Sequence, residues 1–171
     1  MREEVNVYVE VLDKDVILPT YAHDDDAGMD VYAAKDVIIH PNETAIIPTG
    51  LKVAIPDGYE IQVRPRSGLS VNTPLRVPNS PGTIDTGFRN EIGIIMTNTS
   101  NITLSIDNIT GCYFGRTIDD KGNKQGSYFI RKGDRIAQLV LQKVPKIKWN
   151  KVGSVKDIGT DRLGGFGSTG V

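Results

Sequence analysis

Glycine and proline interrupt this chain so often that long helices have little room. Only four stretches longer than ten residues lack both residue types, and they are residues 1–18, 29–40, 94–110 and 134–144. Proline stops a helix and each glycine costs it about 1 kcal/mol, so a helical bundle is excluded. The length of 171 residues suits a single domain. Five of the 18 glycines fall within residues 159–170, so the last dozen residues form an unusual tail.

Hydrophobic and polar residues alternate along several short segments, which is the pattern of half-buried β-strands. Val5–Val11 shows this period, and Leu51–Ile55 and Tyr59–Val63 flank the turn signal Pro56–Gly58 and predict a hairpin. Further strands are expected at 37–39, 45–47, 92–97, 102–106, 128–130 and 136–144. Many short strands indicate a sandwich or barrel.

Two segments could be helical. A spacing of four residues between Ile136, Val140 and Val144 would fit a helix, but the neighbouring β-rich segments favour a strand there. Ser67–Asn72, which lies between two prolines, is the one short helix we expect. The sequence therefore predicts an all-β domain with one short helix.

Charge and cysteine content exclude several function classes. Twenty basic and 21 acidic side chains give a formal net charge of −1, so a basic nucleic-acid-binding face is not expected. Neither a signal peptide nor a run of about 20 apolar residues is present, which predicts a soluble protein of the cytoplasm with no membrane partner. One cysteine and two histidines exclude an internal disulfide and zinc-binding spacing. Any bound metal should be a hard cation with oxygen ligands.

Four segments could carry chemistry. In the first, Asp30 follows Gly28 and opens a strand-like segment, where its carboxylate could orient the waters of a Mg²⁺ ion; a plain solvated acidic loop is the alternative. In the second, Arg66 precedes Ser67 and Gly68 at the start of the expected helix. Arginine and free helix N–H groups bind phosphate, so we expect an anion there. The alternative is that Arg66 forms an ordinary surface ion pair and that Ser67 serves as a plain N-cap of the helix.

The third segment, residues 77–91, has turn-forming clusters on both sides of Thr83–Asp85. It predicts a tight hairpin that presents Asp85 and the ring of Phe88. A hairpin backbone can read the edge of a pyrimidine, and Asp85 is a candidate general base.

The fourth segment is the tail, residues 161–170. Its glycines let backbone N–H groups approach phosphates, although the lysine and following helix of a P-loop are missing. A glycine-rich terminus is most often just disordered. Because Arg162 and Phe166 stand within it, we expect an arm that orders over a ligand and closes the site.

Taken together and in this order, the segments resemble the trimeric dUTP diphosphatases, the dUTPase family. Five family motifs can be placed, at residues 27–31, 66–69, 82–89, 133–139 and 165–170. The resemblance implies a jelly-roll-like β-barrel subunit over residues 1–150, and an arm over residues 151–171. It further implies a homotrimer with three shared active sites and Mg²⁺-dependent cleavage of dUTP to dUMP and pyrophosphate.

The resemblance also implies residue roles. Asp85 would bind the sugar 3′-hydroxyl and activate the attacking water, while Asp30 and Gln138 would steady the waters of the metal and the phosphates. Phe88 would pack against deoxyribose and exclude a 2′-hydroxyl. The remaining substrate contacts would be Arg66, Ser67 and Gly68 to the phosphates, Asn79, Gly82, Thr83 and Ile84 to uracil, Phe166 stacked on uracil, and Arg162, Gly167, Ser168 and Thr169 to the γ-phosphate side.

The chain departs from the family pattern in three places. Gly87-Phe88-Arg89-Asn90 stands where the family has Asp-Tyr-Arg-Gly, so the ring stays and the phenolic hydroxyl is lost. Arg162 lies four residues before Phe166, whereas the family usually has five. The third departure is an insertion of 26 residues, Asn101–Gly126.

The insertion reads as an extra hairpin or small subdomain. A tolerated surface loop is one account of it, since long loops cost little closure entropy. The other is a partner-binding platform, because such an insert resembles the phage-encoded dUTPases of staphylococci, some of which bind a pathogenicity-island repressor. A phage-encoded chain would work in the cytoplasm of the host cell.

Two other functions compete with dUTP hydrolysis. The first is a dCTP deaminase, which shares the fold, and the second is a regulatory binding protein that nucleotide switches without being consumed. Residues 66–69, the Asp85 segment and the terminal arm favour the diphosphatase.

Overall fold

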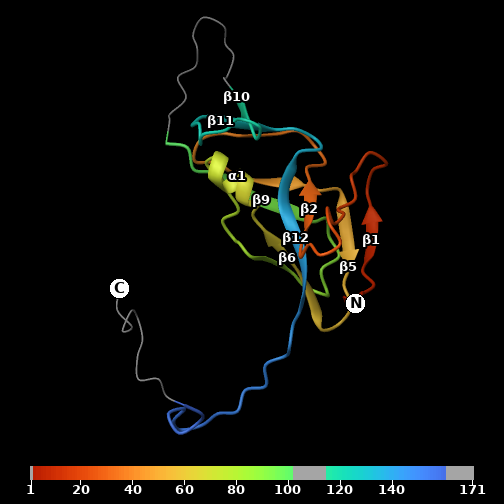
Figure 1. The fold of residues 1–171 in the computed structure, drawn as a ribbon, viewed down its shortest axis with the longest axis vertical. Helices are drawn as coiled ribbons and strands as arrows, with labels where there is room; N and C mark the ends of the chain where they lie inside the picture. Colours follow the sequence, from red (N-terminus) through yellow and green to blue (C-terminus); the bar gives the residue numbers. More distant parts are fainter. Residues whose placement is uncertain (1, 102–114, 161–171) are drawn as a thin grey trace, which may run out of the picture.

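The protein is almost entirely β-structure. The computed structural model describes residues 2–101 and 115–160, and its one described helix is α1 (Ser67–Asn72) (Figure 1). The expected all-β fold and the bounds of the short helix are confirmed. No helix in the described ranges is both long enough and apolar enough to span a membrane.

The strands form four small sheets. The largest has the antiparallel order β2 (Met29–Tyr32), β12 (Arg135–Lys143), β6 (Tyr59–Arg64) and β8 (Gly82–Ile84). A second antiparallel sheet has the order β4 (Thr44–Pro48), β9 (Gly93–Asn98) and β7 (Leu75–Arg76). β11 (Ser127–Ile130) lies between β3 (Val37–Ile39) and β10 (Gly115–Thr117), and β1 (Tyr8–Val11) pairs with β5 (Leu51–Ala54).

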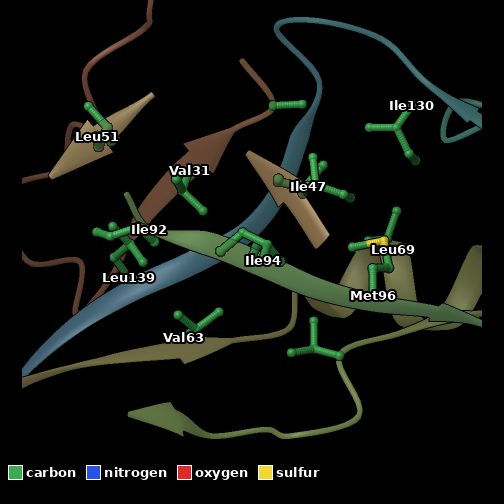
Figure 2. Close-up of a cluster of buried hydrophobic side chains, with 14 of the residues drawn as sticks. Val31, Ile47, Leu51, Val63, Leu69, Ile92, Ile94, Met96, Ile130 and Leu139 are labelled. Carbon is green, nitrogen blue, oxygen red and sulfur yellow. The ribbon is translucent and has the colours of Figure 1, made fainter. Parts of the chain in front are cut away.

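The core lies where the inward faces of these sheets meet. Along β9 every second side chain is buried, and Ile94 and Met96 are fully enclosed. Figure 2 shows them together with Val31, Val63 and Leu139, which come from three strands of the largest sheet. Each such side chain contributes about 1.5–3 kcal/mol through burial. The alternating pattern of the sequence therefore marks the core face of most strands correctly.

The hairpin predicted around Pro56–Gly58 is wrong. β5 and β6 have nearly the expected bounds, but β5 pairs with β1, whereas β6 pairs with β12 and β8. Alternation identifies a strand and its buried face, but it carries no information about which strand lies beside it. The expected strand at 136–144 is present as β12, and the helical alternative for it is excluded.

The N-terminal strand differs from its prediction. A half-buried strand over Val5–Val11 is expected, yet β1 covers only Tyr8–Val11 and all four of its residues are exposed. Tyr8 is 76% exposed and Val9 42%. Val7, just before β1, packs against the core, but Val9 and Val11 remain 42% and 44% exposed, so the core covers this strand only in part.

The described part of the insertion joins the main fold. β10 pairs in parallel with β11, so residues 115–117 extend a sheet of the domain. A turn follows, with a positive φ of 86° at Gly122 and 51° at Asn123. The expected strand at 102–106 lies outside the described residues, and so do Tyr113 and Phe114.

Beyond β12 the chain leaves the sheets. Residues 144–160 form no helix or strand, and all of them are exposed. Figure 1 shows this segment running away from the body of the domain. It carries exposed apolar side chains, with Trp149 at 86%, Val155 at 73% and Ile147 at 68% exposure.

Candidate active site

Asp30 accepts hydrogen bonds from three side chains. Arg66 Nε lies 2.9 Å from Oδ1, Gln138 Nε2 lies 3.3 Å from Oδ1, and Arg135 Nη1 lies 3.3 Å from Oδ2. The Asp30 side chain is 18% exposed and the Arg66 side chain 23%. A carboxylate that holds two guanidinium groups in this way fixes two cations at the edge of the protein surface, where an anion can reach them.

Strand pairing explains why these residues meet. Gln138 on β12 lies directly opposite Asp30 on β2, so both side chains emerge on the same face of the sheet. β12 then has a bulge, because Arg135 pairs with Tyr32 while Ala137 pairs with Val31. The extra residue turns Arg135 to the face that carries Asp30. Arg135 is therefore part of the site. From the sequence it was noted only as a member of the motif at residues 133–139, with no role of its own.

Arg66 comes directly before α1. Its backbone is extended, with φ −84° and ψ 131°, and its carbonyl accepts the N–H of Ser70 at 3.0 Å. No side-chain hydrogen bond caps the helix, and Ser67 is its first residue, so the alternative role of Ser67 as an N-cap is wrong. Leu69 is the one buried residue of α1, which leaves Ser67 and Gly68 exposed beside the guanidinium.

A cleft of about 620 Å³ adjoins this cluster. Its lining includes Arg66, Gly68 and Arg135, together with Ile118 and Lys121 from the insertion. A volume in this range suits a small-molecule ligand, and the cationic side chains favour one that carries negative charge.

Asp85 lies elsewhere on the same sheet. It follows the last residue of β8, is exposed, and its carbonyl accepts the N–H of Phe88 at 3.0 Å in a turn. Phe88 is 36% exposed. The tight hairpin predicted here is wrong, because β8 pairs with β6 rather than with a strand across a turn. Asn79, which is expected to contact the uracil base, lies close to β8. A Cβ at Gly82 would lie 3.1 Å from Nδ2 of Asn79.

The structure does not bring Asp85 to the Asp30 cluster within one chain. β8 is three strands from β2 in the sheet. Following the strand register across the sheet, Asp85 lies four residues along the strand direction from the position level with Asp30. With strand spacings of about 4.8 Å and a rise of about 3.3 Å per residue, the Cα atoms of Asp30 and Asp85 would be roughly 20 Å apart in a flat sheet.

The remaining candidate residues have different outcomes. Thr83 is exposed on β8, and Ile84 beside it is buried at 6% exposure. The candidate arm residues lie outside the described residues, and they are Arg162, Phe166, Gly167, Ser168 and Thr169. In the described ranges, no group of three His, Cys, Asp or Glu side chains converges to hold a metal ion.

Comparison with known proteins gives concordant results. The sequence pattern of the dUTPase family matches residues 14–110. A deoxyuridine 5′-triphosphate nucleotidohydrolase of Clostridium tetani is 38% identical over 98% of this chain and 98% of its own length. A relative of the same name from Wolbachia pipientis is 41% identical over 99% of this chain and 98% of its own length.

Among solved structures, a mutant dUTPase of Staphylococcus bacteriophage 80alpha with dUpNHpp is similar, at a TM-score of 0.80 and 35% identity. The match covers 97% of this chain and 99% of the phage protein. The description of this phage structure states that phage dUTPases control the transfer of virulence genes.

Proposed function

The chain belongs to the dUTPase family, and from this we propose that it cleaves dUTP to dUMP and pyrophosphate by in-line attack of water on the α-phosphorus. The observation that carries the proposal is the Asp30 cluster, in which one carboxylate holds Arg66 and Arg135 beside an open cleft. Two fixed cations there suit a triphosphate, whose transfer chemistry depends on positioning and charge neutralisation.

The phosphate side of the site is assigned to the Asp30 face. Arg66 and Arg135 would donate to phosphate oxygens, and Ser67 and Gly68 would add their exposed groups at the start of α1. Gln138, whose Nε2 already donates to Asp30, would present the rest of its amide to the phosphates or to bound water.

The nucleoside side is assigned to the β8 segment. Asp85 would accept a proton from the attacking water while it binds the 3′-hydroxyl. Asn79 and the backbone of Gly82–Ile84 would read uracil, because cytosine presents the reversed donor and acceptor. Phe88 would pack on the sugar and exclude a 2′-hydroxyl.

A shared site reconciles these two assignments. Because Asp85 and Asp30 are roughly 20 Å apart in one chain, we propose that each site takes them from different copies in a homotrimer. Several exposed apolar side chains are concentrated in residues 144–160, and such a concentration, unlike single scattered residues, supports a contact surface. Arg162, Phe166, Gly167, Ser168 and Thr169 would close the site as part of the arm at 151–171.

Mg²⁺ fits this site through the substrate. Asp30 already pairs with two arginines, so its carboxylate would orient the waters of the ion rather than form a protein cage, with Gln138 beside it. Mg²⁺ commonly keeps several waters and binds through substrate phosphates. When bound, it supplies charge neutralisation to the triphosphate.

The test is pyrophosphate release from dUTP, dCTP, dTTP and UTP, each with and without Mg²⁺. We expect release from dUTP with Mg²⁺ and little from the others. Asp85→Asn should bind a non-hydrolysable dUTP analogue normally and lose about 10²- to 10⁴-fold in turnover, the usual worth of a general base. Near-normal turnover of that variant would refute the role of Asp85. Release of ammonia from dCTP would instead identify a deaminase.

We propose a second activity for the insertion, the binding of a pathogenicity-island repressor protein. Its support is the similarity to the phage 80alpha protein and its described role in virulence-gene transfer. Replacing residues 102–114 by a short Gly-Ser linker should abolish repressor binding and leave dUTP turnover within about twofold. Unchanged binding would sink this proposal.

A further inference from the structure

Residues of the insertion help to line the phosphate-side cleft. Ile118, Asp119 and Lys121 line the same cavity as Arg66 and Arg135. Side chains from both sources would therefore surround any ligand that enters it.

Lys121 differs from the other charged residues of this cleft. Asp119 and Asp134 are both engaged by Arg131, at 2.5 Å and 3.0 Å, and Asp30 is shared by Arg66 and Arg135. The carboxylates of Asp134 and Asp119 hold the pKa of Arg131 above its ordinary value, and Asp134 has the larger effect.

Lys121 is exposed, and among the described residues no carboxylate lies within ion-pair distance of it. Its ammonium is thus the cationic group of the cleft that has no carboxylate partner among the described residues, whereas Arg66 and Arg135 share the carboxylate of Asp30.

The loop that carries Lys121 is fixed on both sides. Asp120 accepts the backbone N–H of Thr117 at 2.8 Å, a bond that holds the pKa of this carboxyl below its ordinary value. Two residues beyond Lys121, the N–H of Asn123 donates to the carbonyl of Asn72 at 2.8 Å.

Asn72 is the last residue of α1, and its side-chain amide donates to the carbonyl of Gly68 at 2.9 Å. The insertion loop is therefore bonded to the helix that begins beside Arg66. Figure 1 shows α1 at the same end of the molecule as β10 and β11.

We propose that Lys121 is a substrate-binding residue that contacts the phosphates of the nucleotide held by Arg66 and Arg135. The inference rests on the proposed hydrolysis of dUTP for the identity of the ligand. It gives the insertion a direct part in binding the substrate, and it couples occupancy of the cleft to the position of the loop at 118–123.

The experiment compares Lys121→Gln with Lys121→Arg and with the matched control Lys124→Gln. Lys124 lies three residues away on the same loop, pairs with Asp120 at 3.6 Å, and does not line the cleft. Lys121→Gln should raise KM for dUTP about fivefold to tenfold, the worth of one exposed charge-assisted contact, and leave kcat within about twofold. It should also make KM less sensitive to salt.

The two other variants separate binding from folding. Lys121→Arg should recover most of the affinity, and Lys124→Gln should match the wild type in KM and in its salt dependence. A KM for Lys121→Gln within about twofold of the wild-type value, or an equal change in Lys124→Gln, would overturn the proposal.

Calorimetric titration with inorganic triphosphate tests the contact of Lys121 with phosphates without relying on catalysis. If the wild type does not hydrolyse dUTP, the proposed function fails, yet the titration still tests Lys121. Weaker binding of inorganic triphosphate by Lys121→Gln than by Lys124→Gln would support the contact, and equal binding would overturn it.

Discussion

Asp30 organises the candidate site at the scale of single residues. Its two oxygens accept from Arg66, which precedes α1, and from Arg135 and Gln138, which both lie on β12. Hydrogen bonds to a charged group are worth about 1.5–3 kcal/mol each, and partial exposure reduces that value here. The carboxylate therefore acts mainly by fixing the direction of two guanidinium groups.

Asp30→Asn should lower kcat/KM for dUTP at least tenfold and cost about 1–2 kcal/mol of stability, because the amide cannot neutralise two arginines. Steady-state kinetics and urea unfolding would measure the two effects. Glu10→Gln is the control, since Glu10 is an exposed residue that pairs with Lys52 at 3.3 Å on another sheet. Wild-type kinetics in Asp30→Asn would contradict the role of this carboxylate.

Residue types and order predicted Asp30, Arg66 and Gln138 through the family resemblance, and the structure brings these three together. The part of Arg135 was not predicted, because its orientation depends on a bulge that alternation does not reveal. The ion-pair partner of Arg66 could not be predicted either, since Asp30 lies 36 residues away in the chain.

At the scale of elements, tight connections decide how strands enter the core. Gly50 joins β4 to β5 with a φ of 71°, and its N–H donates to Glu91 at 2.7 Å. A Cβ at this position would lie 2.3 Å from Cγ2 of Val16. Both the backbone angle and the close approach require glycine here.

Gly50→Ala should therefore destabilise the protein more than Gly58→Ala. Gly58 has a φ of 82°, but no atom lies within 4 Å of its would-be Cβ. The backbone strain of about 1 kcal/mol is common to both variants, and the clash should add about 1–3 kcal/mol to Gly50→Ala alone. Urea denaturation of the two variants gives the difference, and equal losses would show that Val16 moves aside freely.

Strands were easier to predict than their partners. Short periodic segments marked β3, β4, β6, β9 and β12 within a residue or two. The hairpins around Pro56–Gly58 and Asp85 were wrong, because the favourable neighbour of a strand depends on long-range packing of both faces.

At the scale of the whole molecule, the two halves of the candidate site lie on different parts of one sheet. If Asp85 and the Asp30 cluster act on one substrate, as we propose, a separation of roughly 20 Å within one copy is too large for a single chain to supply both. Homo-oligomers with cyclic symmetry solve this problem, since each interface repeats the same pair of surfaces.

Mixing two inactive variants tests this arrangement. Asp85→Asn and Arg66→Ala should each be nearly inactive alone. Co-expressed in equal amounts, they should recover about a quarter of wild-type activity, because about a quarter of shared sites then combine one intact Arg66 with one intact Asp85. Measured turnover of the co-purified mixture checks this, and no recovery would indicate that each chain supplies its own complete site.

The bulge in β12 also determines which positions of that strand tolerate substitution. Counting alternately back from Gln138 assigns Ile136 to the solvent side and Arg135 to the interior, yet Ile136 is fully buried and Arg135 is exposed. A saturation mutagenesis profile of β12 should therefore show two pairs of adjacent intolerant positions, Ile136 with Ala137 at the bulge and Leu139 with Val140 beyond it. A homologous sequence that accepts polar residues at Ile136 or Ala137 should lack the extra residue that forms the bulge in β12.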